Sequence, residues 1–216
     1  MDLAIPIAYP DFKAHSDEIN RDVPSGHAGI LFVDGQHRTT NYYEYGRYDP
    51  PRNQGLVRKQ VIPDAAPAGG RITVRSLKPA FKRLSQLSGH NGRLLAAWIE
   101  VDDGGFEKMR TFCIKRMQAN SDPSRDGYDI TSNNCCTFAR DAADESSATM
   151  PLKIPLGYIF GSFLLFPPVG GALNTVTASP IPTNFLLQLL QFYPGLEFKP
   201  PDTWISKGML RSLDVT

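Results

Sequence analysis

Two strand-forming stretches joined by a turn, in residues 27–48, constrain the fold more than any other feature of the sequence. The apolar run AGILFV (28–33) ends at Asp34-Gly35, a dipeptide typical of β-hairpin turns. After the turn, TTNYYEYGRY (39–48) is rich in β-branched and aromatic residues, which favour strands. The sequence therefore predicts an antiparallel hairpin that begins at His27.

Other strands and helices are predicted on both sides of this hairpin. Further strands are expected at GLVRKQVIP (55–63), GRITVRS (70–76) and RLLAAWIEVD (93–102), and a helix from near Ser76 to the glycines of GHNG (89–92). From Gly105, an apolar stripe at helical spacing predicts a helix with a buried Cys113; the stripe consists of Phe106, Met109, Cys113 and Met117. NSDPSRDG (120–127) is expected to be a loop, and a second helix is predicted after Asn133-Asn134.

Composition indicates a soluble globular chain and excludes several functions. Of the 216 residues, 41% are hydrophobic and 21% charged, enough for one domain with a real core. The net charge is +1 and nucleic-acid motifs are absent, so we expect no nucleic-acid partner. Four scattered histidines and three cysteines form no metal pattern, so neither a metal nor another cofactor is expected. The odd number of cysteines also argues against a disulfide scaffold.

The two ends of the chain suggest where it is made and what it contacts. The N-terminal MDLAIPIAYPDFKAH has no basic region and no long apolar run, so we expect no Sec signal peptide, synthesis in the cytoplasm, and export by another route. Residues 154–196 carry no charge. We divide the chain into a domain at 1–150 and an apolar, Pro/Gly-rich extension at 151–216. The extension either packs on the domain as loops and a helix, or contacts a membrane or partner.

SNNCCTFARD (132–141) places two cysteines where a helix should begin. With Asn133 or Asn134 as the N-cap, Cys135 falls in the first turn, where the helix dipole lowers a thiol pKa and free N–H groups can bind an oxyanion. The alternative is two small residues that fill a core. On a helical wheel Cys135 is the first residue of the face that packs against the rest of the domain. Cys136 shares a side with Arg140, nearer to solvent. Cys135 is therefore the candidate nucleophile.

His27 is the candidate base for such a thiol. His15, His37 and His90 fall in a charged stretch, at the hairpin turn and in a glycine-bounded turn. His27 starts a strand, and if the turn centres near Gly35-Gln36 it pairs with Glu44 or a residue next to it. A carboxylate in that position would orient the imidazole. Read alone, Glu44 is equally well explained as one exposed acid on an aromatic strand.

GHAGILFVDG…YYEYGRYD followed far downstream by Y…NNCxTFARD resembles the circularly permuted papain-like cysteine hydrolases related to NlpC/P60. The residues of these two motifs are most similar to those of amidase-type effectors of type VI secretion systems. The resemblance covers roughly residues 24–145. The resemblance implies Cys135 as nucleophile, His27 as base and Glu44 as acidic orienter, with Asp49 in reserve. Asn134 and Cys136 are implied as oxyanion or supporting residues. Cys136 departs from the family, which tends to have a small residue such as Gly there.

The resemblance implies an α+β permuted papain-like fold, with a small antiparallel sheet packed against helices. It implies an antibacterial enzyme that hydrolyses amide bonds in the peptide stem of peptidoglycan through a thioester. The expected partners are this substrate, a cognate immunity protein and a component of the secretion apparatus. Such an effector is made in the cytoplasm without a signal peptide, exported by a contractile secretion system, and active in the target cell's periplasm.

Two alternatives use the same sequence features. A permuted papain-like acyltransferase or thioesterase acting on lipids would also place a histidine strand before an NC helix, and residues 154–196 would then contact a membrane. A catalytically degenerate domain would use the apolar tail only for binding. Products released from sacculi or from phospholipid distinguish the two enzymes, and an unreactive Cys135 would favour the binding module.

Overall fold

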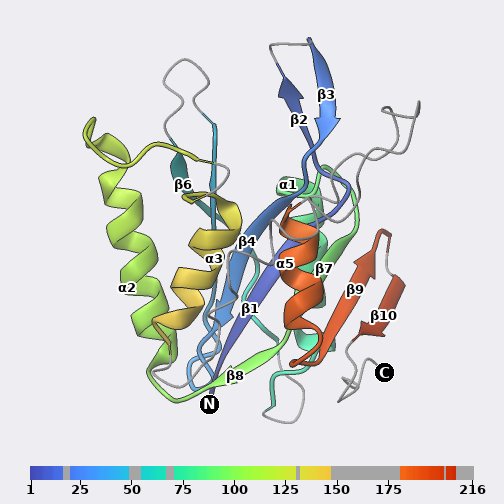
Figure 1. Ribbon diagram of the computed structural model, residues 1–216. Helices are drawn as coiled ribbons and strands as arrows, with labels where there is room; N and C mark the ends of the chain where they lie inside the picture. The colour runs from blue at the N-terminus through green and yellow to red at the C-terminus, as the bar shows by residue number, and fades with distance from the viewer. Residues whose placement is uncertain are drawn as a thin grey trace.

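A computed structural model describes residues 1–16, 20–48, 55–66, 71–129, 132–146, 181–201 and 203–207. Within these residues the main sheet is antiparallel and has eight strands, in the order β10-β9-β7-β1-β4-β5-β6, with β8 also paired to β1. Its strands are β1 (Asp2–Tyr9), β4 (His27–Val33), β5 (Thr40–Gly46), β6 (Leu56–Gln60), β7 (Leu94–Ala97), β8 (Ile99–Val101), β9 (Gly195–Lys199) and β10 (Thr203–Lys207). A separate hairpin, β2 (Lys13–Ser16) and β3 (Arg21–Pro24), projects beyond one end of the sheet (Figure 1).

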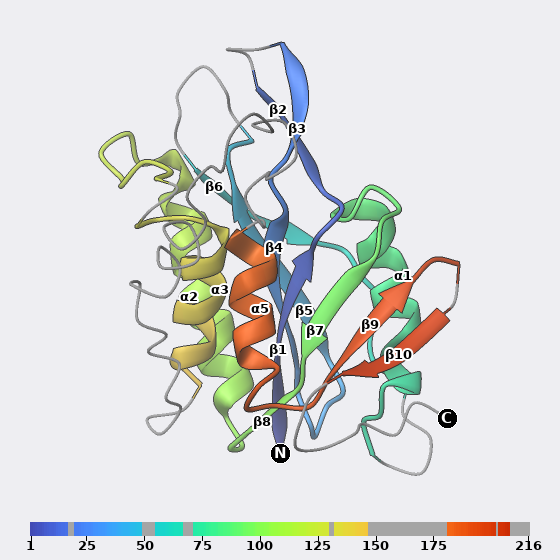
Figure 2. The same ribbon diagram turned by 45° about the vertical axis from the view of Figure 1, so that its right-hand side comes forward.

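Helices cover both faces of the sheet, so the fold is α+β with three layers (Figures 1 and 2). One face carries α2 (Gly105–Gln118), α3 (Cys135–Asp144) and α5 (Ile181–Leu189), and the other carries α1 (Lys78–Leu87). Short 3-10 turns precede α1 (η2, Arg75–Leu77) and follow α2 (η3, Ala119–Ser121). None of the helices in the described residues has the length and apolar character needed to cross a membrane.

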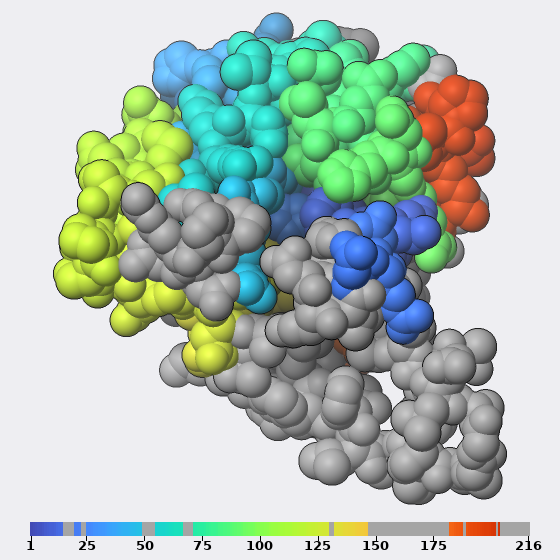
Figure 3. Space-filling view, turned by 90° about the horizontal axis from the view of Figure 1, so that it is seen from above, coloured from blue at the N-terminus to red at the C-terminus, as the bar shows by residue number. Residues whose placement is uncertain are grey.

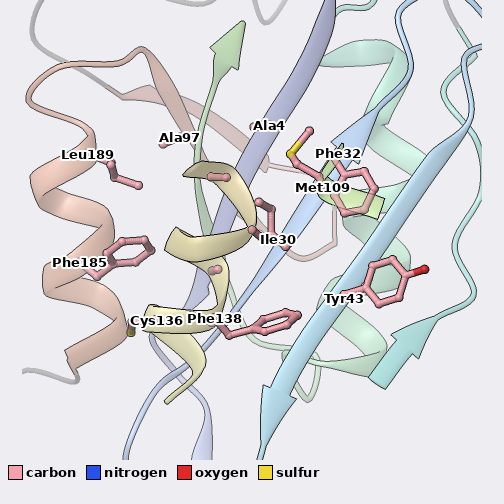
Figure 4. Packing of buried hydrophobic residues seen from close by; sticks show 14 of the residues in the cluster. Ala4, Ile30, Phe32, Tyr43, Ala97, Met109, Cys136, Phe138, Phe185 and Leu189 are labelled. Carbon is pink, nitrogen blue, oxygen red and sulfur yellow. The ribbon is translucent and has the colours of Figure 1, made fainter. Parts of the chain in front are cut away.

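Each face of the sheet has its own hydrophobic core. Along β4 the side chains alternate: Ile30 and Phe32 belong to the core under α2, α3 and α5, while Leu31 and Val33 belong to the core under α1. Figure 4 shows the first core, in which Phe138 of α3 lies against the sheet. Cys113 of α2 is fully buried there, as predicted.

The predicted hairpin is confirmed, but its register differs from the expected one. β4 pairs with β5, and Asp34 N donates to Thr39 O across a six-residue loop (2.9 Å). Gly29, and not His27, lies opposite Glu44. A shift of two residues keeps every side chain on its original face. His27 and Glu44 therefore still share a face and meet diagonally.

The strand predicted at GRITVRS is wrong. Residues 71–74 form no strand and lead into the 3-10 turn η2. Thr73 N donates to Ser76 Oγ (3.0 Å) and Ser76 N to Thr73 Oγ1 (3.3 Å), so these short polar side chains satisfy the local backbone. The β-branched residues Ile72 and Val74 contact the core from this turn, which explains the misleading pattern.

The central strand β1 was not predicted from the sequence. All eight of its residues are buried, so DLAIPIAY lacks the alternation of a half-exposed strand, and Pro6 argues against a central strand. The structure accommodates Pro6 because the neighbouring strand is interrupted beside it: β8 pairs with β1 up to Ala4, and β7 pairs from Ile7 onward. Trp98, between β7 and β8, donates its N–H to Pro194 O instead (2.7 Å).

The described part of the C-terminal extension belongs to the folded body. The predicted apolar helix is α5, which buries Phe185, Leu186 and Leu189 in the core under α3. β9 then pairs with β7 and extends the main sheet. Residues 154–180 of the extension lie outside the described residues, and the boundary at 150 stays a prediction.

Candidate active site

His27 and Cys135 reach the same place from opposite faces of the sheet. His27 begins β4 and pairs with Tyr9 of β1, whose ring belongs to the core under α1. Cys135 begins α3, which packs on the other face. The starts of β4 and α3 lie toward the upper end of the sheet in Figure 1, and Figure 3 looks down on this end. The two side chains lie close enough there for each to shift the pKa of the other, which brings the predicted base to the predicted nucleophile.

The start of α3 is fixed by a capping box. Asn134 Oδ1 accepts from the backbone N–H of Cys136 (2.8 Å) and Thr137 (3.1 Å), and Thr137 Oγ1 accepts from Asn134 N (2.8 Å). Of the two asparagines predicted as caps, Asn134 has this role. Cys135 therefore occupies the first helical position, where the helix dipole favours a thiolate.

Asn133 holds the loop that precedes the helix. Its Nδ2 donates to Gly127 O (2.8 Å) and to the Tyr45 hydroxyl (3.1 Å), and its Oδ1 accepts from Arg116 (3.1 Å). These contacts place Tyr128, whose ring stacks on Tyr45, beside Cys135. The Tyr128 hydroxyl lies 4.0 Å from Cys135 Sγ.

Glu44 is buried, not exposed, and contacts His27. Glu44 Oε2 lies 3.2 Å from His27 Nε2, and the two side chains are 3% and 7% exposed. Two further groups donate to the carboxylate: the Tyr42 hydroxyl (3.2 Å) and Gln60 Nε2 (2.8 Å). The reading of Glu44 as a solvated residue is thereby excluded, and its position fits that of an orienting acid.

A tyrosine that the sequence reasoning did not single out completes the surroundings of the imidazole. The Tyr48 hydroxyl lies 3.0 Å from His27 Nε2. Burial raises the pKa of Tyr48 well above its ordinary value, and the negative charge of Glu44 raises it further, so the phenol keeps its proton. Because Nε2 faces the oxygens of Glu44 and Tyr48, Nδ1 is the ring nitrogen left for Cys135.

Two glycines make room for the tyrosines of this network. A Cβ on Gly29 would lie 2.2 Å from the Tyr42 hydroxyl, which bonds Glu44. A Cβ on Gly46 would lie 2.8 Å from Cζ of Tyr48. The sequence pattern G-x-Y at 46–48 was the available signal for Tyr48, since a glycine at the strand end allows the second residue to fold back over it.

The pKa shifts of the three groups favour a charged pair. Burial lowers the pKa of His27, but hydrogen bonds to Cys135 and Glu44 outweigh it and raise the pKa to about 9. Burial likewise raises the pKa of Glu44, yet its bond to His27 and the charge of that ring bring it down to about 2. The pKa of Cys135 lies well below its usual range, because of hydrogen bonds from Cys136 and His27 that outweigh burial. The directions of these shifts favour a thiolate, an imidazolium and a carboxylate together in the site.

The predicted position of Cys136 is wrong. It is only 2% exposed and belongs to the core with α5, instead of lying near solvent with Arg140. Figure 4 shows its side chain on the side of α3 nearer to α5. The helical wheel failed here because it assumed one buried face, whereas α3 packs on the sheet, α2 and α5. Burial raises the pKa of the Cys136 thiol, as does its bond to Cys135, so Cys136 is a protonated neighbour of Cys135.

The remaining candidates are not part of this cluster. His37 lies in the β4–β5 loop and bonds the neighbouring Asp34 (2.8 Å), and His90 follows α1 in an exposed turn. Asp49, the reserve orienter, lies outside the described residues. Among the described residues, no group of three or more His, Cys, Asp or Glu side chains is arranged to hold a metal ion.

The chain is similar to known effector proteins over most of its length. The family model described as "Type VI secretion system effector TseH-like" matches residues 4–151. The crystal structure of the type VI secretion system effector TseH superposes with a TM-score of 0.70 at 26% identity, covering 95% of this chain and 97% of that chain. No curated protein sequence matches the chain.

Proposed function

Because the chain belongs to the TseH-like family of type VI secretion system effectors, we propose that it is a cysteine hydrolase of the permuted papain-like, NlpC/P60-related type. Its substrate would be amide bonds in the peptide stem of peptidoglycan, in the periplasm of the target cell. The observation that carries the proposal is the buried chain of contacts from Cys135 through His27 to Glu44. The order of the two elements, histidine strand before cysteine helix, is that of the permuted architecture.

In the proposed reaction the Cys135 thiolate attacks the amide carbonyl carbon and a C–S bond forms. The His27 imidazolium then gives its proton to the leaving nitrogen as the C–N bond breaks, which leaves a thioester on Cys135. Neutral His27 next takes a proton from water, and the resulting hydroxide attacks the thioester. The C–S bond breaks, a carboxylic acid is released, and the thiolate–imidazolium pair is restored. Glu44 keeps the ring oriented and stabilises its charged form throughout.

The oxyanion of this reaction requires donors close to Cys135 Sγ. Asn134 occupies the N–H groups of Cys136 and Thr137, so these two are not available. The N–H of Cys135 takes no part in the helix cap; its acceptor is the Tyr128 hydroxyl, which is itself close to Sγ. We assign these two groups as the oxyanion donors. The role of Asn134 is then to fix the helix, and that of Cys136 to donate its S–H to the thiolate.

We infer the wider setting of the protein from its family. As an effector it would be loaded by a component of the secretion apparatus and neutralised in the producing cell by a cognate immunity protein. The hydrolase domain would comprise residues 1–150. The extension at 151–216 would support it, as α5 and β9 do by packing on the domain.

The test is a digest of purified sacculi, with phospholipid vesicles incubated in parallel. Wild type, Cys135→Ala and the neighbouring-thiol control Cys136→Ser are compared, and released fragments are identified by mass spectrometry. We expect new stem fragments from wild type and Cys136→Ser, and none from Cys135→Ala. Lysolipid in place of stem fragments would favour the lipid-directed alternative. Stem fragments released equally by Cys135→Ala would exclude the mechanism.

A further inference from the structure

An exposed arginine is held beside the active site by the tyrosine that contacts His27. The guanidinium carbon of Arg58, on β6, lies 3.6 Å from the centroid of the Tyr48 ring. The hydroxyl of the same ring lies 3.0 Å from His27 Nε2. One tyrosine ring therefore separates this cation from the base, and stacking on that ring restricts where the guanidinium can move.

Arg58 lacks an anionic partner among the residues that the structure describes. Its cross-strand neighbour is Glu44, which faces the same side of the sheet. The Glu44 oxygens, however, take their hydrogen bonds from His27, Tyr42 and Gln60, and no ion pair joins Glu44 to Arg58. Stacking fixes this exposed guanidinium but does not neutralise it. Its N–H donors therefore remain available to bind a ligand.

We propose that Arg58 binds a free carboxylate of the substrate, so that the enzyme prefers acidic stem peptides over their amidated counterparts. This inference rests on the proposed function, because it names a subsite of the same active site. A planar guanidinium matches a carboxylate with two parallel N–H···O bonds, whereas a neutral carboxamide can accept only part of that pattern. Tyr48 would then link carboxylate binding at Arg58 to proton transfer at His27, since its ring face supports Arg58 and its hydroxyl contacts His27.

The next residue on the strand offers a matched control. Lys59 is also exposed and cationic, but alternation along β6 places it on the opposite face. Its Nζ lies 5.7 Å from the ring centroid of Tyr43, which belongs to the core under α2 and α3. Lys59→Gln therefore removes the same charge from the same strand, on the face that does not carry Glu44.

Two alkylating reagents of nearly equal shape test the site without knowledge of the natural substrate. Iodoacetate carries a carboxylate and iodoacetamide does not; both form a C–S bond with Cys135 and release iodide. The ratio of their rates is measured by mass spectrometry of the Cys135 peptide in wild type, Arg58→Gln and Lys59→Gln. The neutral reagent corrects for any change in the thiolate itself. Removal of a nearby cation should lower the ratio about two- to fivefold in Arg58→Gln, and Lys59→Gln should keep the wild-type ratio.

The outcomes separate this inference from the function on which it rests. If neither reagent alkylates Cys135 in wild type, the proposed function is wrong and the subsite has no reaction to serve. If Cys135 is alkylated but Arg58→Gln keeps the wild-type ratio, or Lys59→Gln lowers it equally, only the Arg58 subsite is wrong. For hydrolysis, stem peptides with a free or an amidated carboxylate should differ in kcat/KM for wild type and differ less for Arg58→Gln. An equal preference in both proteins would also overturn the proposal.

Discussion

The two halves of the candidate site are built by different means. The sheet supplies His27 and Glu44 on paired strands, within a buried polar network that includes Tyr42, Tyr48 and Gln60. The helix supplies Cys135, which is positioned by backbone geometry. A capping box fixes the start of its helix, and Asn133 holds the loop that precedes it. The sheet half therefore supplies the buried carboxylate–imidazole pair, and the helix half fixes the position of the sulfur.

This difference predicts how each half should fail. A buried carboxylate with three donors is costly to leave without its cationic partner, because the interior solvates charge poorly. Loss of the Cys135 thiol is less costly, because His27 keeps its contact with Glu44 and the capping box bonds backbone groups and not Sγ. Damage to the sheet half should thus affect activity and stability together, whereas loss of the thiol should affect activity alone.

The largest expected effect is loss of the reacting pair. Cys135→Ala and His27→Gln should each lower kcat/KM for stem-peptide hydrolysis by about four orders of magnitude or more. Only His27→Gln should also destabilise the fold, by about 3 kcal/mol, because it leaves Glu44 buried without its ion-pair partner. Denaturant unfolding beside a hydrolysis assay measures both. Equal loss of stability in the two variants would contradict the division between the halves.

Next in size is the orienting acid. Glu44→Gln keeps the shape but replaces an anion with a neutral acceptor, so activity should fall by roughly ten- to ten-thousand-fold. The acid limb of the pH–rate profile should also move upward, because the thiolate forms less readily beside a less stabilised imidazolium. Asp34→Asn makes the same chemical change in an exposed carboxylate–histidine pair and is the matched control. A wild-type profile for Glu44→Gln would remove Glu44 from the site.

Sequence reasoning anticipated which residues lie together at the candidate site better than it anticipated the fold around them. Cys135, His27 and Glu44 each stood at a position with a local signal: a helix start, a strand start and a strand-pairing partner. Even the wrong hairpin register left Glu44 on the correct face, because the error was two residues and side chains alternate with that period. Strand β4 packs against α3 through Ile30 and Phe32, on the face opposite to that of His27. His27 lies on the α1 face, and it meets Cys135 only because both are at the same end of the sheet.

What the sequence did not reveal depends on tertiary contacts. β1 is buried on both faces and interrupted by Pro6, so neither alternation nor strand propensity marked it. Tyr48 and Tyr128 were quoted within motifs, but their roles come from a ring folded over Gly46 and a loop held by Asn133. Cys136 is buried by α5, an element 45 residues further along the chain. No local pattern encodes a contact of that range.

A smaller effect is expected from the helix cap. Asn134→Ala removes the acceptor for two backbone N–H groups and should lower the free energy of unfolding by about 0.5–2 kcal/mol. Activity should fall less than in Glu44→Gln, because the charged pair itself is intact. Ser132→Ala, just before the cap and exposed, serves as the control for a side-chain truncation in this segment. Unchanged stability in Asn134→Ala would mean that the capping box does not fix α3.

The smallest effect should follow a change at the second thiol. Cys136→Ser keeps a hydrogen-bond donor next to Sγ of Cys135, so activity at neutral pH should stay within about threefold of wild type. Cys136→Ala removes the donor and should raise the pKa of Cys135, which a pH series of alkylation rates would detect. If Cys136, and not Cys135, proves to be the alkylated residue, the assignment of the nucleophile is wrong.

The most direct test of the charged pair is the ultraviolet absorbance of the thiolate as a function of pH, in wild type and in His27→Gln. The difference spectrum against Cys135→Ala isolates the signal of this one sulfur. Because the pKa of Cys135 is lowered and that of His27 is raised to about 9, wild type should show its thiolate signal at a lower pH than an ordinary cysteine does. Hydrolysis should decline as the pH rises through about 9, where the imidazolium loses its proton. In His27→Gln the thiolate should appear only at higher pH. A wild-type thiolate that forms only near the ordinary cysteine pKa of about 8.5 would contradict the account.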